Sequence, residues 1–324
     1  MLPTTDLPGD PPQNRIASVA GPSTSPDPSS TPWAPPRLAR GRAVPSSPSI
    51  SVIVPALNEA QNLPIVLPRI PADVFEVILV DGNSTDDTVA VARAVLPSIR
   101  IVPQQGRGKG AALRTGFAAA KGDIIVMIDA DGSTQPEEIP AFVQKLLDGH
   151  DFVKGSRFMA GGGTADMSWL RALGNWGFTM LTRVFFGGAY TDLCYGYNAF
   201  WRRVVPMLEL TGTGFEIETM MNIRALRANL RVAEVPSFEA ARIYGESNLR
   251  TFPDGWRVLK TIFRERFRAV PLPQAPHGEE PLRLAMSMPI RPTTRVAVPI
   301  EERHEAHARY ESTSATPSEV IAAR

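Results

Sequence analysis

Short runs of β-branched and apolar residues, each ending in polar or acidic residues, constrain the fold of this chain more than any other feature. The runs at 50–55, 75–80 and 123–128 are nearly all apolar, which is typical of strands buried on both faces of a parallel sheet. Helix-compatible stretches separate them, so the pattern predicts alternating strands and helices with right-handed crossovers. We therefore expect an α/β fold on a mostly parallel sheet flanked by helices.

Weaker patterns predict the remaining elements. A helix over 59–70 should be short or broken, because Pro64 and Pro68 interrupt it. Ser84 or Thr85 should cap the helix that follows them. Further strands are expected at 99–102, 151–153 and 230–236, an extended run at 238–244, helices at 88–94, 109–120, 215–229 and 255–268, and an aromatic-rich amphipathic stretch at 169–190.

Polar and acidic residues follow three of the apolar runs. Asn58 and Glu59 follow the first, Asp81 the second, and Asp129 and Asp131 the third. Ligands of parallel sheets bind beyond the carboxyl ends of the strands, so these groups should face one cleft. Residues i and i+2 of an extended chain share a face, so both carboxylates of the DAD sequence can reach one divalent ion. Hard oxygen ligands suit Mg²⁺ or Mn²⁺, and the sequence predicts such a metal site.

A glycine-rich basic loop, GRGKG at 106–110, opens the helix expected at 109. Backbone N–H groups at a helix N-terminus suit anions. The loop is not a P-loop, because Gly110 follows Lys109 where that motif requires Ser or Thr. Direct contact with a phosphate and a flexible turn near the ligand are both open interpretations.

Proline is unevenly distributed. The chain has 31 prolines in 324 residues, and twelve of them lie in a Ser/Thr-rich stretch at 1–48. Such segments bury too little apolar surface to offset their chain entropy, and the composition of 270–324 is similar. We expect disordered or loosely attached tails at 1–48 and 270–324, and one catalytic domain at 49–269.

Charge and cysteine content exclude several classes of protein. The formal net charge of +1 excludes a globally basic nucleic-acid binder, and the single cysteine, Cys194, excludes a disulfide framework and a multi-cysteine zinc site. No apolar window is long enough for a transmembrane helix, and no secretory signal is evident. We expect a cytoplasmic protein. We also expect that this protein can contact the inner face of the membrane.

Five motifs together resemble the family 2 glycosyltransferases. They are, in order, VIVPALNE at 52–59, VDGNSTD at 80–86, GKG at 108–110, DAD at 129–131 and GSR at 155–157. Within that family the chain is most similar to the dolichol- and polyprenyl-phosphate mannosyl or glucosyl synthases, over about 49–250. The resemblance implies a GT-A fold and inverting transfer of a hexose from a UDP- or GDP-linked sugar.

The resemblance also implies roles for individual residues at the donor. The donor and its metal would be held by Pro55, Leu57, Glu59, Asp81, Lys109, Asp129, Ala130, Asp131 and Arg242. The metal ligands would be Asp129 and Asp131. The synthases often carry a Gln two residues after the second Asp, but this chain has Ser133 there and Gln135 slightly later, so the third ligand is open.

On the acceptor side, the resemblance implies that Arg157 and Arg171 clamp a lipid phosphate, aided by Asn175. Guanidinium groups suit this role because they bind phosphate bidentately and stay charged. A phosphate monoester is already nucleophilic at neutral pH, since its second pKa is about 6. An alcohol acceptor would instead need a carboxylate base, for which Glu216 and Glu218 are the candidates.

Four classes of function stay open. The leading interpretation is transfer to a polyprenyl phosphate, with peripheral membrane contact through the apolar faces of 169–190 and 255–268. The second is a soluble family 2 enzyme acting on a small hydroxylated or polymeric acceptor. A nucleotidyltransferase is disfavoured because no glycine-rich signature follows the first strand. A non-catalytic nucleotide-sugar-binding scaffold is disfavoured because Asp129 and Asp131 are both present.

Overall fold

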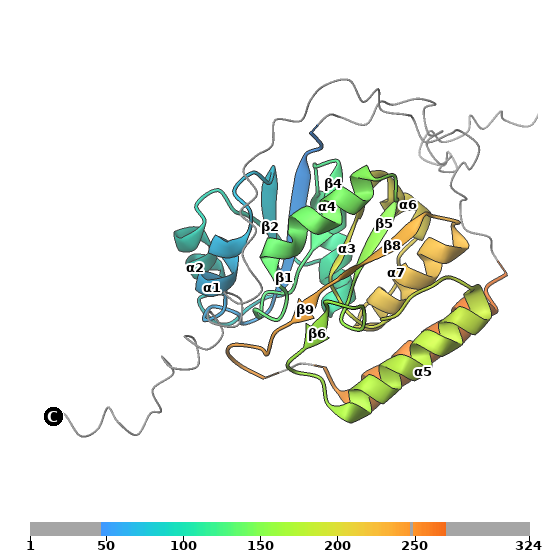
Figure 1. The fold of residues 1–324 in the computed structure, drawn as a ribbon. Coiled ribbons are helices and arrows are strands. Elements are labelled where there is room, and N and C mark those ends of the chain that lie inside the picture. The colour runs from blue at the N-terminus through green and yellow to red at the C-terminus, as the bar shows by residue number, and fades with distance from the viewer. Residues whose placement is uncertain (1–46, 247–248, 270–324) are drawn as a thin grey trace, which may run out of the picture. The chain divides into compact units, whose positions relative to one another are not determined.

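The described part of the chain contains a seven-stranded sheet in the order β3-β2-β1-β4-β7-β5-β8 (Figure 1). The computed structural model describes residues 47–246 and 249–269. All neighbouring pairs are parallel except those of β7, which runs antiparallel to β4 and β5. The strands are β1 (Ile50–Ala56), β2 (Glu76–Asp81), β3 (Arg100–Pro103), β4 (Ile124–Met127), β5 (Phe152–Ser156), β7 (Asn198–Trp201) and β8 (Val232–Pro236). The predicted mostly parallel sheet is confirmed.

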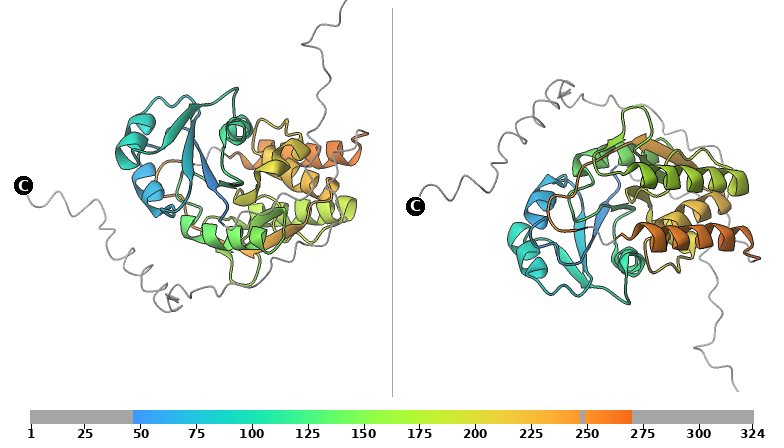
Figure 2. Two further views of the ribbon diagram at one scale, coloured as in Figure 1. Left: turned by 90° about the horizontal axis from the view of Figure 1, so that it is seen from above. Right: turned by 90° about the horizontal axis from the view of Figure 1, so that it is seen from below.

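Some helices cover the sheet, and others pack on one another beside the cavity described below. The α-helices are α1 (Leu63–Val66), α2 (Thr88–Val95), α3 (Lys109–Ala119), α4 (Ile139–Leu147), α5 (Trp169–Phe186), α6 (Val205–Leu208), α7 (Glu216–Arg227) and α8 (Thr251–Arg266). Short 3₁₀ turns are η2 (Leu67–Arg69), η3 (Pro136–Glu138) and η4 (Arg202–Val204). Helix α3 packs on β1 and β2, α4 packs on β5 and β7, and α8 packs on both α5 and α7 (Figure 2).

The three motif-bearing strands form the centre of the core. Apart from Ile50 and Pro55 of β1, which are partly buried, their apolar residues are buried, as expected for strands covered on both faces. Helix α3 approaches β1 closely at Gly116, where a Cβ atom would lie 2.4 Å from Ile53 Cγ2. This close contact positions the N-terminus of α3, and therefore Lys109, beside the carboxyl end of the sheet.

Several local predictions need correction. Neither Ser84 nor Thr85 caps α2; the N-cap is Asp87, and its side chain makes no capping hydrogen bond. The extended run expected at 238–244 contributes only the two-residue strand β9 (Phe238–Glu239), which pairs with β6 (Gly163–Thr164). The broken helix after β1 is confirmed as α1 followed by η2. The tails predicted at 1–48 and 270–324 lie outside the described residues, apart from 47 and 48.

Candidate active site

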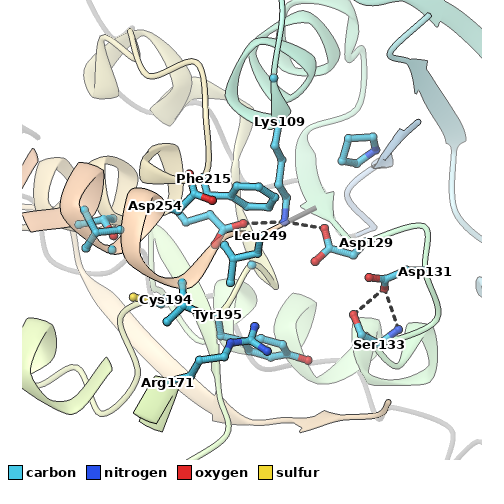
Figure 3. A pocket seen from close by; sticks show the side chains of 18 of the residues that line it. Lys109, Asp129, Asp131, Ser133, Arg171, Cys194, Tyr195, Phe215, Leu249 and Asp254 are labelled. Atoms are coloured by element: carbon cyan, nitrogen blue, oxygen red, sulfur yellow. Dashed lines mark hydrogen bonds and ion pairs between the residues drawn. The ribbon is translucent and has the colours of Figure 1, made fainter. Parts of the chain in front are cut away.

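A cavity of about 970 Å³ lies at the carboxyl ends of β1 and β4 and extends to α5 and α8 (Figure 3). Its lining includes most of the residues predicted for the site: Pro55, Leu57, Glu59, Lys109, Asp129, Ala130, Asp131, Arg157, Arg171, Asn175 and Arg242. Asp81 and Glu216 are not in the lining, although Gly82, directly after Asp81, is. The topology therefore brings together residues that lie far apart in the chain, from Pro55 to Arg242.

The first carboxylate of the DAD sequence belongs to a three-residue ion cluster. Lys109 Nζ lies 2.7 Å from Asp129 Oδ1 and 2.7 Å from Glu218 Oε1 (Figure 3). Burial alone would lower the pKa of Lys109, but the two carboxylates outweigh burial and raise it. A Cβ atom on Gly196 would lie 2.7 Å from Glu218 Oε1 and 3.1 Å from Lys109 Nζ, so the cluster can form because residue 196 has no side chain.

The second carboxylate belongs to a separate cluster. Asp131 Oδ1 accepts hydrogen bonds from the Ser133 N–H at 2.9 Å and the Ser133 hydroxyl at 2.6 Å, and Oδ2 lies 2.9 Å from Arg242 Nη2. Arg242 Nη1 also pairs with Glu59 at 3.0 Å. Ser133, at the position where the synthases often carry Gln, thus orients Asp131. Gln135 points elsewhere and bonds Arg69.

The glycine-rich loop packs against another loop of the protein. Gly108 has a φ of +89°, and a Cβ atom there would lie 2.3 Å from the Thr213 carbonyl oxygen. That oxygen accepts hydrogen bonds from the N–H groups of Gly110 at 2.9 Å and Ala111 at 3.3 Å. Two N–H groups of the first turn of α3 are therefore occupied within the protein. This favours the interpretation of the loop as a structural turn that delivers Lys109, over a phosphate cradle.

Arg157 has its charge compensated within the protein. Its guanidinium contacts Asp192 at 2.7 and 3.0 Å and Glu239 at 3.0 Å, and it lies over the Tyr195 ring at 4.8 Å. Burial alone would raise the pKa of Asp192, but the Arg157 guanidinium outweighs burial and lowers it. Glu239 was missed at the sequence level, because only the β6–β9 pairing brings it to this site.

Arg171 and Asn175 lie on the cavity side of α5. The Arg171 guanidinium is 3.8 Å from Asp166, and its side chain retains 29% of its accessible surface. Asn175 Oδ1 accepts a hydrogen bond from the Cys194 N–H at 3.0 Å, which ties α5 to the 191–197 loop. Burial raises the pKa of the Cys194 thiol to about 12, so this thiol is not a nucleophile at neutral pH. Of the two predicted clamp arginines, Arg171 has the weaker carboxylate pairing.

Glu216 and Glu218 have different environments. One Glu216 carboxylate oxygen accepts hydrogen bonds from the N–H groups of Thr213 and Gly214, both at 3.0 Å, at the start of α7. Glu218, one of the two candidate bases, is the one that lines the cavity. Glu216, one of the predicted catalytic residues, does not line the cavity, and its role as a base stays a prediction.

We expect Glu218→Gln to lower turnover at least about tenfold, because it removes one of the two charges that hold Lys109 in place. The matched change Glu216→Gln should leave turnover within about twofold and cost at most about 1 kcal/mol of folding free energy, since the amide oxygen still accepts both N–H groups. Steady-state kinetics and urea denaturation measure the two effects. Equal kinetic losses in the two variants would contradict the assignment.

The donor atoms present fit a divalent cation. Asp129 and Asp131, which both line the cavity, would supply two hard oxygen ligands, and Mg²⁺ sites commonly use one or two carboxylates with substrate phosphates and water. Among the described residues no group of three His, Cys, Asp or Glu side chains forms a metal site. The arrangement therefore fits a cation completed by a phosphate-bearing ligand better than an all-protein site. Lys109 and Arg242 neutralise these carboxylates in the structure.

Comparisons with known proteins show the family of this chain. Residues 51–206 match the family model described as glycosyl transferase family 2. An undecaprenyl-phosphate mannosyltransferase of Micrococcus luteus is 31% identical over 62% of this chain and 87% of its own length. A dolichol-phosphate mannosyltransferase of Pyrococcus furiosus is 31% identical over 62% of this chain, which spans only 59% of that relative.

The solved structures show the same architecture. Glucosyl-3-phosphoglycerate synthase from Mycobacterium tuberculosis, in complex with Mn²⁺, UDP and glucosyl-3-phosphoglycerate, matches with a TM-score of 0.55 and 27% identity, over 67% of this chain and 80% of that one. Together, the fold and the sequence matches define a glycosyltransferase. The chain belongs to glycosyltransferase family 2, and the predicted GT-A fold is confirmed.

Proposed function

We propose that this protein transfers a hexose, with inversion, from a UDP- or GDP-linked sugar to a polyprenyl phosphate. The observation that carries the proposal is the set of residues that line a single cavity. Its acidic end holds Asp129 and Asp131, and its other end holds Arg171 beside apolar side chains of α5 and α8. The named relatives from Micrococcus luteus and Pyrococcus furiosus, which are polyprenyl- and dolichol-phosphate mannosyltransferases, support this acceptor class.

At the donor end, Pro55, Leu57 and Glu59 are proposed to contact the nucleoside, as is Asp81 from just outside the cavity lining. Asp129 and Asp131 would hold Mg²⁺ or Mn²⁺, and the bound cation would offset the charge that develops on the departing diphosphate. The glucosyl-3-phosphoglycerate synthase structures that contain Mn²⁺ or Mg²⁺ with UDP support this cofactor. Arg242, beside Asp131, is proposed to bind the diphosphate oxygens with its guanidinium.

The transfer step requires no proton removal by the protein. An acceptor phosphate oxygen forms a bond to the anomeric carbon while the bond from that carbon to the diphosphate oxygen breaks, and the bonding electrons leave with the nucleoside diphosphate. Arg171 is proposed to hold the acceptor phosphate in line. Arg157, held by Asp192 and Glu239, is proposed to orient the acceptor loop.

A second candidate acceptor is a small, soluble, phosphate-bearing molecule. Its support is that the glucosyl-3-phosphoglycerate synthase neighbour was crystallised with phosphoglyceric acid. Both acceptor classes require a cation at the position of Arg171. They differ in whether the apolar part of the cavity is used.

We expect Arg171→Ala to lower transfer to polyprenyl phosphate at least about 100-fold with little change in donor binding, because a charge-assisted, bidentate contact is lost. Arg183→Ala, on the same helix, removes a guanidinium that bonds the Ala189 carbonyl and should have little effect. Radiolabelled-sugar transfer measures the first quantity and calorimetric titration with nucleotide the second. Prenyl phosphate, phosphoglycerate and alcohol acceptors should be assayed in parallel with several nucleotide sugars. Transfer only to the soluble acceptors would contradict the proposal.

Membrane contact is part of this proposal. Within the described ranges, no helix is both long and apolar enough to cross a bilayer. A long prenyl chain is insoluble in water, so an enzyme that uses it must reach the membrane surface. We propose that the protein acts at the cytoplasmic face of the membrane.

A further inference from the structure

A fully buried lysine lies in the sheet, outside the cavity lining. Lys154, in the middle of β5, has no exposed surface, whereas lysine is almost never fully buried unless its charge is paired. Among the described residues its ammonium group donates one hydrogen bond, to the Tyr195 carbonyl, and forms no ion pair. Burial lowers the pKa of Lys154, although the charges of Asp192, Glu218 and Glu234 act in the opposite direction. A buried charge with one neutral partner costs folding free energy, so stability alone does not explain this lysine.

Tyr195 belongs to the 191–197 loop, which contacts both ends of the cavity. At the donor end, a Cβ atom on Gly196 would lie 2.7 Å from a carboxylate oxygen of the three-residue ion cluster described above. At the other end, the Cys194 N–H donates to Asn175 of α5 at 3.0 Å. The position of this loop therefore sets the spacing between the ion cluster and α5.

Two neighbouring strands hold the loop through charged side chains. Glu234 of β8 lies opposite Lys154 in the parallel β5–β8 register. Its carboxylate accepts hydrogen bonds from the Thr191 N–H at 2.9 Å and the Asp192 N–H at 3.3 Å. Glu234 thus holds the start of the loop, and Lys154 holds the Tyr195 carbonyl further along. Because both side chains come from the sheet, the loop is tied to a rigid part of the fold.

We propose that Lys154 is a positioning residue, whose ammonium group fixes the Tyr195 carbonyl so that the 191–197 loop aligns the acceptor phosphate with the donor sugar. Lys154 does not line the cavity, so it acts through the loop. The alignment rests on the proposed function, whereas the holding of the loop does not. Methionine is the matched replacement, because it is flexible and unbranched like lysine but has no charge and no N–H donor.

The thiol of Cys194 reports the position of the loop without an activity assay. Cys194 is the only cysteine in the chain and is partly buried, so it should react slowly with dithiobis(nitrobenzoate). Lys154→Met should raise the rate of this reaction at least about tenfold, because the loop would open more often. Lys145→Met is the matched control, since Lys145 of α4 is 45% exposed, and it should leave the rate unchanged. Equal rates in Lys154→Met and the wild type would overturn the proposal.

Kinetics separate positioning from support of the whole fold. Lys154→Met should lower kcat for transfer to polyprenyl phosphate at least about tenfold, and the affinity for UDP or GDP, measured by calorimetry, should stay within about twofold. The urea midpoint should stay close to that of the wild type, since removal of the buried charge offsets loss of the hydrogen bond. If this variant does not fold, Lys154→Gln, whose side chain is one atom shorter, should show the same two changes. Unfolding of both variants, or equal losses of kcat and nucleotide affinity, would show a general structural role and contradict the proposal.

A double variant tests whether Lys154 acts through the loop. Gly196→Ala places a Cβ atom against the ion cluster and should displace the loop at its other contact, so it should also lower kcat. The combined variant Lys154→Met with Gly196→Ala should lose no more than the more severe single variant, because both changes act on one element. Losses of kcat that multiply in the combined variant would overturn the proposal.

Two outcomes distinguish this inference from the proposed function. If the wild-type chain transfers hexose to no prenyl phosphate while Lys154→Met speeds the thiol reaction, the proposed function fails and the holding of the loop is supported. If Lys154→Met speeds the thiol reaction but keeps the wild-type kcat with prenyl phosphate, the positioning role fails and the proposed function stands.

Discussion

Replacing Asp131 with alanine should lower turnover at least about 10³-fold, because the change would remove a carboxylate that is proposed to hold a divalent cation, and with it several kcal/mol of charge stabilisation for the departing diphosphate. The change also frees Arg242 from its 2.9 Å contact and leaves the Ser133 hydroxyl without its partner. Initial-rate measurements with saturating donor, over a titration of Mn²⁺, measure the effect. EDTA should abolish the activity of the wild-type chain in the same assay.

The matched control is Asp87→Ala. Asp87 is an exposed aspartate whose side chain makes no capping bond to α2, so turnover should be unchanged. Circular dichroism should show that both variants are folded. Binding of Mn²⁺ and UDP, followed by electron paramagnetic resonance of Mn²⁺, gives a readout independent of turnover, and the Asp131 variant should bind Mn²⁺ more weakly. Undiminished wild-type activity in metal-free buffer would remove the metal from the mechanism.

The second large effect concerns stability. Arg224→Ala should lower the free energy of unfolding by about 3–5 kcal/mol, the usual cost of removing one partner from a buried ion pair. Arg224 and Glu265 join α7 to α8 at 2.7 Å, and their side chains are only 2% and 1% exposed. Arg224 also donates to the Leu208 carbonyl at 3.0 Å and to the Glu209 carbonyl. The variant would therefore leave a buried carboxylate and two carbonyl groups with one partner fewer. Urea denaturation measures the loss.

An exposed ion pair provides the comparison for this prediction. Glu137→Gln breaks the Arg69–Glu137 pair, whose side chains are 30% and 57% exposed, and should cost at most about 1 kcal/mol. The double change Arg224→Met with Glu265→Leu replaces the buried pair with apolar side chains. It should recover part of the loss, because it removes both buried charges together. A loss below about 1 kcal/mol in Arg224→Ala would show that α8 is not held to α7 in this way.

The donor half of the site was predictable because the apolar runs of the sequence form neighbouring strands of one parallel sheet. Strands β1, β2 and β4 are short, mostly apolar runs, and a parallel sheet must place their carboxyl ends at one edge. Glu59, Asp129 and Asp131 therefore had to converge, and all three line the cavity. Asp81 does not line the cavity, and its contact with the nucleoside stays a prediction. Its Oδ1 atom accepts a hydrogen bond from the Ser84 N–H within its own turn, and the next residue, Gly82, lines the cavity instead.

The acceptor half was less predictable because it depends on contacts across long stretches of chain. Arg157 was expected to bind a lipid phosphate, but Asp192 and Glu239 hold its guanidinium, and neither is near it in sequence. Glu216 and Glu218 are two residues apart, and only the packing of α7 decides which one reaches the cavity. The membrane contact expected for 169–190 and 255–268 stays a prediction.

The five motifs indicated the family by resemblance. By itself, the order of apolar runs and acidic strand ends determined the fold class and the edge of the sheet that carries the site. These follow from backbone periodicity and from the fixed handedness of β-α-β units, which act over a few tens of residues. The tertiary structure alone decided how charges are paired: Lys109 between Asp129 and Glu218, Arg242 between Glu59 and Asp131, and Arg157 away from solvent. Pairing depends on distances of a few ångströms between distant segments and on burial, and neither is encoded in local sequence.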